Sequence, residues 1–226
     1  MSVNTAKVLV RMFGDISSAI DAEKDRLTAL DGAIGDADHG ITMSLGFNAV
    51  TMELASMDLD HERGGAILTR AAAAFLNAVG ASTGPLYASA FLRAAKVLEP
   101  EDTLTTLNQV RLIEALTLGI RERGKGQLGD KTMLDAWIPA MEAAAGAKAR
   151  DLSPDQMWRE ITDAADAGAQ ATASMIAARG RSARLGERSL GHIDPGAASA
   201  AIILRAMKTS FLTVEPTELC DPLGAV

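Results

Sequence analysis

Three aspartates, Asp31, Asp36 and Asp38, fall within eight positions of a stretch that also contains two glycines. Magnesium prefers oxygen ligands in octahedral geometry, and it commonly completes its shell with water and substrate phosphates. Two such ions would connect a diphosphate to this stretch. An EF-hand is excluded because no glutamate stands at the twelfth position counted from any of the three aspartates. The alternative is an ordinary turn in which the aspartates bond to nearby backbone, and the spacing favours neither interpretation.

Two hydroxyl residues, Ser82 and Thr83, stand in a short glycine turn that leads into Pro85. Free backbone N–H groups at a helix N-terminus attract anions, so these residues are candidates for phosphate contacts. No Gly-Lys-Ser or Gly-Lys-Thr closes a longer glycine loop, so this is not a Walker motif. A plain connection is the more common role of such a turn.

Basic residues mark two later loops. Lys131 follows Asp130 in a Gly-Asp-Lys-Thr stretch, where it could counter phosphate charge or simply be solvated. Arg181, Arg184 and Arg188 share the next glycine-rich loop, and the planar guanidinium suits bidentate phosphate recognition. A solvated basic turn is the competing interpretation.

The three histidines give less information. His39 and His192 are candidates for general acids, metal ligands or buried polar groups, whereas His61 is expected at the surface. The hydroxyl residues lack a recognisable nucleophile elbow, so no Ser-His-Asp triad is indicated. Covalent hydrolase chemistry is therefore unsupported.

Composition limits the class of protein. The chain has 226 residues, 48% hydrophobic, and a formal net charge of −7, which fits one domain over 1–226 and argues against a nucleic-acid binder. The start of the chain shows no basic segment followed by an apolar one, and no stretch approaches a membrane span. We expect a cytoplasmic protein. The lone Cys220 is expected to be a spectator thiol.

The spacing of apolar residues predicts an all-α fold. Residues such as Ile67, Leu68, Phe75 and Val79 share one helical face, and no run of alternating β-branched residues is present. We predict eight helices, over residues 5–24, 43–57, 63–79, 85–98, 103–123, 132–147, 154–179 and 195–212. We predict three prolines as first helical residues: Pro85, Pro154 and Pro195. The residues before the last two, Ser153 and Asp194, are predicted N-caps.

The connections between these helices alternate between two kinds. Four are rich in glycine and in candidate residues: 31–42, 80–84, 124–131 and 180–194. The other three, 58–62, 99–102 and 150–153, are short and charged. In an antiparallel up-and-down arrangement, alternate connections emerge at the same end, so the four candidate loops are predicted to converge.

Four motifs together give a family resemblance. They are Ile34-Gly35-Asp36-Ala37-Asp38-His39-Gly40 with Asp31 before it, Gly84-Pro85-Leu86-Tyr87, Gly129-Asp130-Lys131-Thr132-Met133, and Gly186-Glu187-Arg188-Ser189-Leu190-Gly191-His192-Ile193-Asp194-Pro195-Gly196. In order and spacing, the chain resembles the nucleotide-binding L subunit of dihydroxyacetone kinase over nearly its whole length. The resemblance implies an eight-helix antiparallel barrel with a nucleotide site at one end.

The resemblance also implies roles for individual residues. Asp31, Asp36 and Asp38 would hold two Mg2+ ions against the phosphates of ADP or ATP. The residues implied to contact the nucleotide are His39, Gly40, Ile41, Thr42, Ser82, Thr83, Gly124, Met133, Arg181, Asp194, Pro195 and Gly196. One departure is Ala81, where family members commonly carry a second glycine, and its methyl group would narrow backbone access to phosphate.

The implied function is half of a kinase. The chain would deliver a phosphoryl group to a small ketose held by a separate K subunit, without a covalent nucleophile of its own. ATP would exchange as a cosubstrate, or bound ADP would be rephosphorylated by a phosphocarrier of the phosphotransferase system. A homodimer is possible. The alternatives are a kinase subunit for another keto sugar such as erythrulose, a non-catalytic nucleotide or lipid sensor, and, ranked lowest, a metal-dependent phosphohydrolase.

Overall fold

The computed structural model describes residues 4–80, 82–100 and 102–213. Within these residues the secondary structure is entirely helical, which confirms the predicted fold class. The α-helices are α1 (Thr5–Ala22), α2 (Lys24–Ile34), α3 (His39–Leu54), α4 (Gly64–Ala78), α5 (Thr83–Val97), α6 (Thr106–Gly124), α7 (Leu134–Ala149), α8 (Pro154–Ala171) and α9 (Pro195–Leu212). Two 3-10 helices, η1 (Thr172–Ser174) and η2 (Ser182–Ser189), lie between α8 and α9. The predictions for Ala81 and Cys220 fall outside the described residues.

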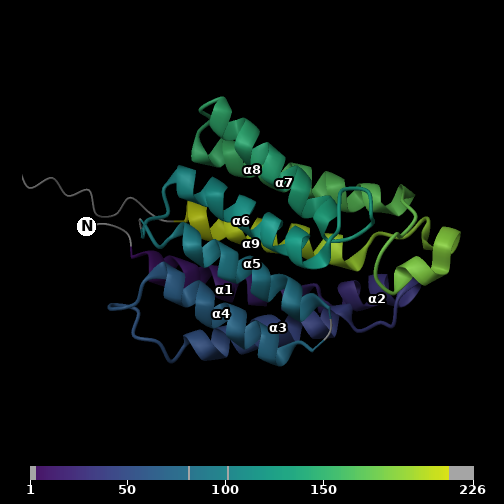
Figure 1. The fold of residues 1–226 in the computed structure, drawn as a ribbon, viewed down its shortest axis with the longest axis horizontal. Coiled ribbons are helices and arrows are strands. Elements are labelled where there is room, and N and C mark those ends of the chain that lie inside the picture. The colour runs from purple at the N-terminus through teal and green to yellow at the C-terminus, as the bar shows by residue number, and fades with distance from the viewer. Residues whose placement is uncertain (1–3, 81, 101, 214–226) are drawn as a thin grey trace, which may run out of the picture.

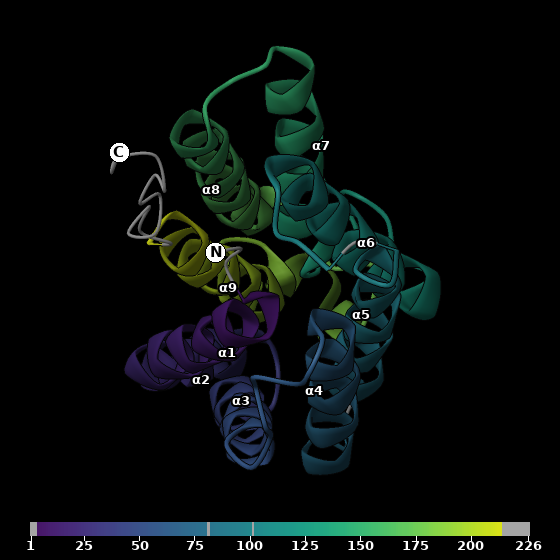
Figure 2. The same cartoon turned by 90° about the vertical axis from the view of Figure 1, so that its left-hand side faces the viewer.

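The helices form a closed ring in chain order. From α3 to α9 each helix packs against the next, α3 packs against α1, and α9 returns to α1 (Figures 1 and 2). Apart from α2, which extends α1 toward one end, the helices alternate in direction. The short charged connections lie at the other end, where two of them bond to the start of α1. The Thr5 hydroxyl donates to Asp102 O over 2.8 Å, and the Asn4 amide donates to Leu59 O over 2.9 Å. The predicted up-and-down barrel is therefore confirmed.

The first helical stretch is longer than predicted. The chain stays helical to Ile34 with one interruption at Glu23, so Asp31 lies on a helix instead of in a loop. The predicted helix over 5–24 was thus too short, because the prediction took Asp31 and the glycines after it as a loop. Its buried side chains are Leu27, Asp31 and Ile34, so the aspartate occupies a core-facing position of the stripe.

Other boundaries differ for identifiable reasons. α3 begins at His39 instead of residue 43, because a carboxylate from α2 satisfies its first N–H groups. α8 ends at Ala171 instead of residue 179, and the buried Thr172 begins a 3-10 turn there. Pro85 is the third residue of α5, not the first, which costs no hydrogen bond within the first turn. The N-cap predictions for Ser153 and Asp194 are confirmed by side-chain bonds to Gln156 N and Ala197 N.

The last helix, α9, forms much of the core. It is buried on nearly all sides from Pro195 to Phe211 and packs against α1, α7 and α8. Small residues such as Ala197, Ala200 and Ala201 let the neighbouring helices approach it closely. The N-terminus of α9 lies at the end of the molecule where the candidate loops meet.

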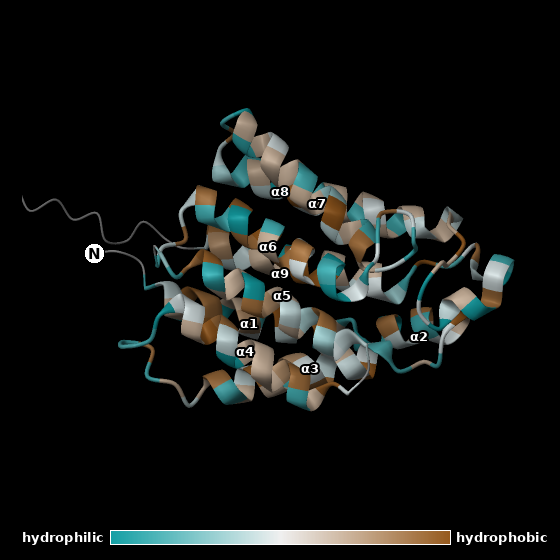
Figure 3. Cartoon of the chain, in the orientation of Figure 1, coloured by the Kyte–Doolittle hydropathy of each residue, from teal (hydrophilic) through white to brown (hydrophobic). Residues whose placement is uncertain are grey.

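Hydrophilic and hydrophobic residues alternate along the helices, and the connection between α3 and α4 at the left contains a hydrophilic stretch (Figure 3). No helix in the described part of the chain combines the length and apolar character needed to cross a membrane.

Candidate functional site

The four candidate connections surround one cavity of about 460 Å3. Residues from the α2–α3, α4–α5, α6–α7 and α8–α9 connections line it, so the predicted convergence is confirmed. Of the residues predicted to bind metal or nucleotide, the structure places these at the cavity: Asp31, Asp36, Asp38, His39, Thr42, Ser82, Thr83, Gly124, Met133, Arg181, Asp194, Pro195 and Gly196. A wider groove of about 940 Å3 runs outside α5 and α6, but it contains none of the three aspartates.

Asp31 organises the acidic part of the cavity. Its Oδ2 accepts hydrogen bonds from the backbone N–H of Asp38 over 2.8 Å and of His39 over 3.2 Å. A carboxylate from α2 therefore caps the N-terminus of α3, which fixes the turn 35–38 between them. Gly35 is required here because a Cβ would lie 2.2 Å from Asp31 Oδ1.

The three aspartates form a compact set of oxygen donors. One carboxylate oxygen from each of Asp31, Asp36 and Asp38 lies within 4.8 Å of the others. Partial burial, together with the charge of Asp31, raises the pKa of Asp38. The Arg181 guanidinium contacts Asp36 and lies 3.3 Å from Asp38 Oδ2. Three clustered carboxylates at the rim of a cavity are a donor set that fits divalent cations.

His39 is a buried neutral residue and not an exposed acid. Its Nε2 lies 2.9 Å from Ser199 Oγ on α9, and the Ser199 hydroxyl donates to Gly196 O over 3.0 Å. Burial lowers the pKa of His39 to about 4, despite the opposing charge of Asp31. The imidazole is therefore uncharged at neutral pH and connects the acidic turn to the start of α9.

The N-termini of α5 and α9 are among the helix ends that line the cavity. Ser82 and Thr83 begin α5, and Gly84 must be glycine because a Cβ would lie 2.0 Å from Val79 O. Asp194 caps α9 by accepting from Ala197 N over 2.7 Å, and Pro195 and Gly196 form the first turn. Burial raises the pKa of Asp194 to about 7, although the Ala197 hydrogen bond and the charge of Lys131 oppose this shift.

Two of the predicted nucleotide residues do not line the cavity. Gly40 packs against α2, where a Cβ would lie 2.1 Å from Lys24 O. Ile41 is 50% exposed. Their contacts with a nucleotide remain predictions. His192 does not line the cavity either, and His61 is exposed beside Asp58.

Comparison with known proteins agrees with this geometry. The family described as the DAK2 domain matches residues 33–209. This chain belongs to the DAK2 domain family. It is 37% identical over 195 residues to the "PEP-dependent dihydroxyacetone kinase, ADP-binding subunit DhaL" of Escherichia coli, covering 86% of this chain and 90% of that protein. It is 34% identical to the "PTS-dependent dihydroxyacetone kinase, ADP-binding subunit DhaL" of Lactococcus lactis, covering 90% of this chain and 96% of that protein.

Solved structures show the same fold. The native dihydroxyacetone kinase of C. freundii matches with a TM-score of 0.70 at 25% identity. The alignment covers 92% of this DAK2 domain but only 35% of the C. freundii chain. The domain therefore corresponds to about a third of that larger kinase.

The structure adds site residues that the sequence analysis missed. Arg123 and Arg179 line the cavity of this DAK2 domain, and Ser199 supports His39 from α9. Asp135 is buried at 1% exposure and accepts from Gly129 N over 2.6 Å and Thr132 N over 2.7 Å. The sequence did contain a signal for Asp135, which is a carboxylate near the start of a predicted helix that follows a glycine-rich loop. Ser199 gave no signal, since serine in an alanine-rich helix is ordinary.

Proposed function

We propose that this DAK2 domain is the ADP-binding or ATP-binding phosphotransfer subunit of a dihydroxyacetone kinase. The domain is a single nucleotide-binding unit over 1–226. Its substrate, a small ketose, is held by a separate K-type subunit. Asp31, Asp36 and Asp38 would hold two Mg2+ ions, which would neutralise charge on the nucleotide phosphates.

One observation carries this proposal. Three carboxylates within 4.8 Å of one another share a cavity with two helix N-termini and with Arg181. The acidic group alone would repel a polyanion, but divalent cations bound to it reverse the local charge, and the helix N-termini then favour phosphate oxygens. At about 460 Å3, the cavity is within the usual range for a nucleotide-sized ligand.

The reaction assigned to the site is in-line phosphoryl transfer. Catalysis of this kind depends on positioning and on neutralising charge, so no protein nucleophile is needed. The magnesium ions would supply charge neutralisation on the phosphoryl oxygens. The chain itself fixes the three carboxylates through the Asp31 cap, aims the N-termini of α5 and α9 at the phosphates, and places Arg181 at the rim. His39 stays neutral and positions the turn.

The names of two relatives support one of the two proposed sources of the phosphoryl group. The names of the E. coli and L. lactis proteins describe PEP-dependent and PTS-dependent kinases with ADP-binding subunits. The favoured version is therefore a bound ADP that a phosphocarrier protein rephosphorylates in place. Exchange of ATP as an ordinary cosubstrate is the second version.

Two alternatives have less support. The "L-erythrulose kinase" of Pectobacterium atrosepticum is 30% identical, but the alignment covers only 34% of that protein. A lipid sensor would need an interior cavity, and the apolar void between the barrel helices measures about 20 Å3. That space holds about one water and no acyl chain.

The direct test is calorimetric titration of ADP with and without Mg2+. We expect binding with Mg2+ and none in EDTA. Equal binding in both conditions would show that ADP binds without Mg2+ held by the aspartates. Mixing the domain with a K subunit and dihydroxyacetone, and supplying either ATP or a phosphorylated carrier, then separates the two donor versions. Steady ATP consumption without any partner would instead favour a phosphohydrolase.

A further inference from the structure

The segment 172–194 leaves the ring of helices and returns to it, carrying Arg181 to the rim of the cavity. It contains the polar 3-10 helix η2 and the glycines Gly180, Gly186 and Gly191, all with positive φ angles. In Figure 1 it forms the yellow-green projection at the right-hand end. Such a segment has little apolar surface to bury, so specific polar contacts must hold it in place.

The two ends of the segment are joined to each other. Gly191 N donates to Ala173 O over 2.8 Å, and Asp194 N donates to Thr172 Oγ1 over 2.9 Å. Further along, Ala177 N donates to Ser189 Oγ over 3.0 Å. The segment is therefore a closed loop whose base lies beside the start of α9.

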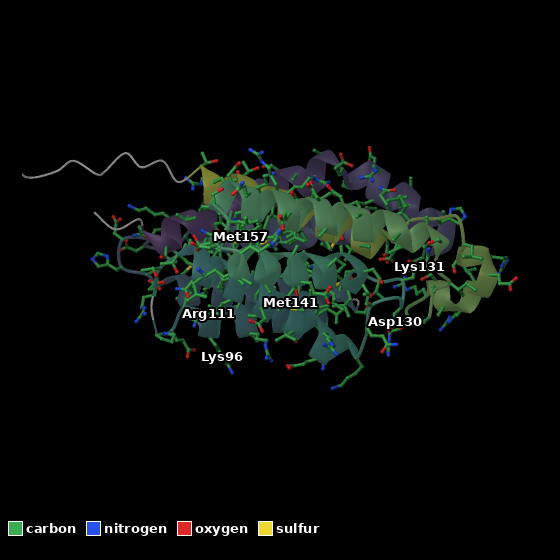
Figure 4. All side chains as sticks on the ribbon, turned by 90° about the horizontal axis from the view of Figure 1, so that it is seen from above. Lys96, Arg111, Asp130, Lys131, Met141 and Met157 are labelled. Carbon is green, nitrogen blue, oxygen red and sulfur yellow. The ribbon has the colours of Figure 1, made fainter. Side chains whose placement is uncertain are left out.

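Two neighbouring residues of the α6–α7 connection hold this base. Asp130 O accepts from Ala178 N over 3.1 Å, and Asp130 Oδ2 accepts from Arg179 Nε over 2.7 Å. The side chain of Lys131 donates from Nζ to Thr172 O at one end of the segment and to His192 O at the other. Figure 4 shows Asp130 and Lys131 together at this end of the molecule.

Lys131 is unusual because it is 1% exposed although it is a lysine. Burying an ammonium group is costly unless its hydrogen bonds and charge are compensated. Two carbonyl oxygens accept its protons, and the carboxyl groups of Asp135 and Asp194 act on it electrostatically. Its backbone adopts the left-handed conformation, with φ of 59°. The ammonium group of this buried residue is thus hydrogen-bonded to both ends of the 172–194 segment.

We propose that Lys131 is a positioning residue for the nucleotide site. Its ammonium group holds the two ends of the 172–194 segment together, so that Arg181 stays at the rim beside Asp36 and Asp38. An apolar side chain of similar length would fill the space but could not bridge two carbonyl oxygens. The consequence for the nucleotide rests on the function proposed above, whereas the effect on the segment does not.

The first experiment compares Lys131→Met with Lys125→Met by limited trypsin digestion. Lys125 lies in the same connection, also has a positive φ, and is exposed, so it is a matched control. Cleavage after Arg179, Arg181, Arg184 and Arg188 should accelerate by about tenfold or more in Lys131→Met, because the segment opens locally. At these four bonds Lys125→Met should be cleaved at the wild-type rate, although it loses the tryptic site after residue 125. Equal cleavage in all three proteins would overturn the proposal. So would loss of overall helix content in Lys131→Met, since Lys131 would then support the whole barrel.

The second experiment separates positioning from metal binding. Mn2+ alone should bind Lys131→Met as it binds the wild type, because the three aspartates are unchanged. Affinity for ADP with Mg2+ should fall by roughly 10–100-fold, the usual effect of removing a supporting partner around a ligand site. A wild-type protein that binds no nucleotide would contradict the proposed function, but the digestion result would still decide whether Lys131 holds the segment.

The third experiment restores the ammonium group chemically. In a Cys220→Ser background, Lys131→Cys is alkylated during refolding with 2-bromoethylamine, or with 1-bromopropane as a neutral control of the same length. The thiolate displaces bromide in both cases. Only the aminoethyl form should regain resistance to trypsin and nucleotide affinity. If the propyl form recovers equally, side-chain volume and not the ammonium group is responsible, and the proposal fails.

Discussion

The aspartates of the acidic cluster differ in their structural roles. Asp31 is buried and accepts two backbone hydrogen bonds, whereas the side chain of Asp36 is 49% exposed and bonds to Arg181. Sequence spacing treats the two alike. Their surroundings predict different effects on stability and the same effect on ligand binding.

Asp31→Ala and Asp36→Ala form a matched pair that tests this difference. Each should weaken Mg2+-dependent ADP binding on the order of 100-fold, because outer-shell losses alone commonly cost about 10–100-fold. Only Asp31→Ala should also lower the free energy of unfolding, by about 1 kcal/mol, because the N-terminus of α3 loses its cap. Titration calorimetry and urea denaturation measure the two quantities. Equal destabilisation by both substitutions would argue against the capping role of Asp31.

Two buried groups give opposite pH dependences. Asp194, with its pKa raised to about 7, binds more protons when folded than when unfolded, so the free energy of unfolding falls as pH rises from about 4 to about 7. His39, with its pKa lowered to about 4, binds fewer protons when folded, so stability rises with pH between about 4 and 6.5. The two contributions largely cancel in the wild type.

Substituting either residue should reveal the pH dependence of stability that the other residue contributes. Asp194→Asn keeps an N-cap side chain but cannot ionise, so its unfolding free energy should rise from pH 4 to 6.5 by a few kcal/mol, since one pKa unit corresponds to about 1.4 kcal/mol. The unfolding free energy of His39→Gln should fall over the same pH range. Chemical denaturation at a series of pH values provides the measurement. Parallel profiles for both variants would show that the two shifts are absent.

At the scale of elements, the contact between α7 and α8 shows how a proline and a glycine fit together. Pro139 lies inside α7 and has no N–H, so the carbonyl of Asp135 lacks its usual helical donor. Gly168 of α8 packs against this carbonyl, where a Cβ would lie 2.0 Å from Asp135 O. The close approach also fixes Asp135, whose carboxylate holds the connection that carries Lys131.

Gly168→Ala should therefore destabilise the protein although alanine favours helices by about 1 kcal/mol. The methyl group would push α7 and α8 apart, and overpacking of this kind typically costs about 1–3 kcal/mol. Gly14→Ala in α1 is the control, because a Cβ there meets nothing within 4 Å and should stabilise the helix. Urea midpoints compare the two. A stabilised Gly168→Ala variant would contradict the tight crossing.

At the scale of the whole molecule, the nucleotide site is a property of the closed ring. Its lining comes from four connections and from both chain halves, so ligand binding and folding are coupled. A ligand that binds only the folded state stabilises it in proportion to the logarithm of its concentration over Kd.

ADP with Mg2+ at about 100 times Kd should add about 2.7 kcal/mol of stability. For a chain of this size, that corresponds to a rise in Tm of roughly 5–10 °C. Differential scanning calorimetry should show this rise in Mg2+ and no rise in EDTA. At the same ADP concentration, Asp36→Ala should rise by only about 1–2 °C, because its affinity is lower on the order of 100-fold. A rise that persists in EDTA would mean that the nucleotide binds without the metal site.

The sequence by itself determined the helical class, the up-and-down order and the end of the molecule where the candidate loops meet. These follow from local patterns, since an apolar face repeats along each helix and the connections alternate in composition. It also identified Asp31, Asp36, Asp38 and Arg181 as residues of one site, and the structure brings them to one cavity.

Only the tertiary structure decided what each of these residues experiences. Asp31 lies on a helix whose buried face it shares with Leu27 and Ile34. His39 is neutral because α9 covers it, and Lys131 holds the 172–194 segment because folding brings two distant carbonyl oxygens to its ammonium group. Burial and long-range hydrogen bonds depend on which elements pack together, and no local pattern carries that information.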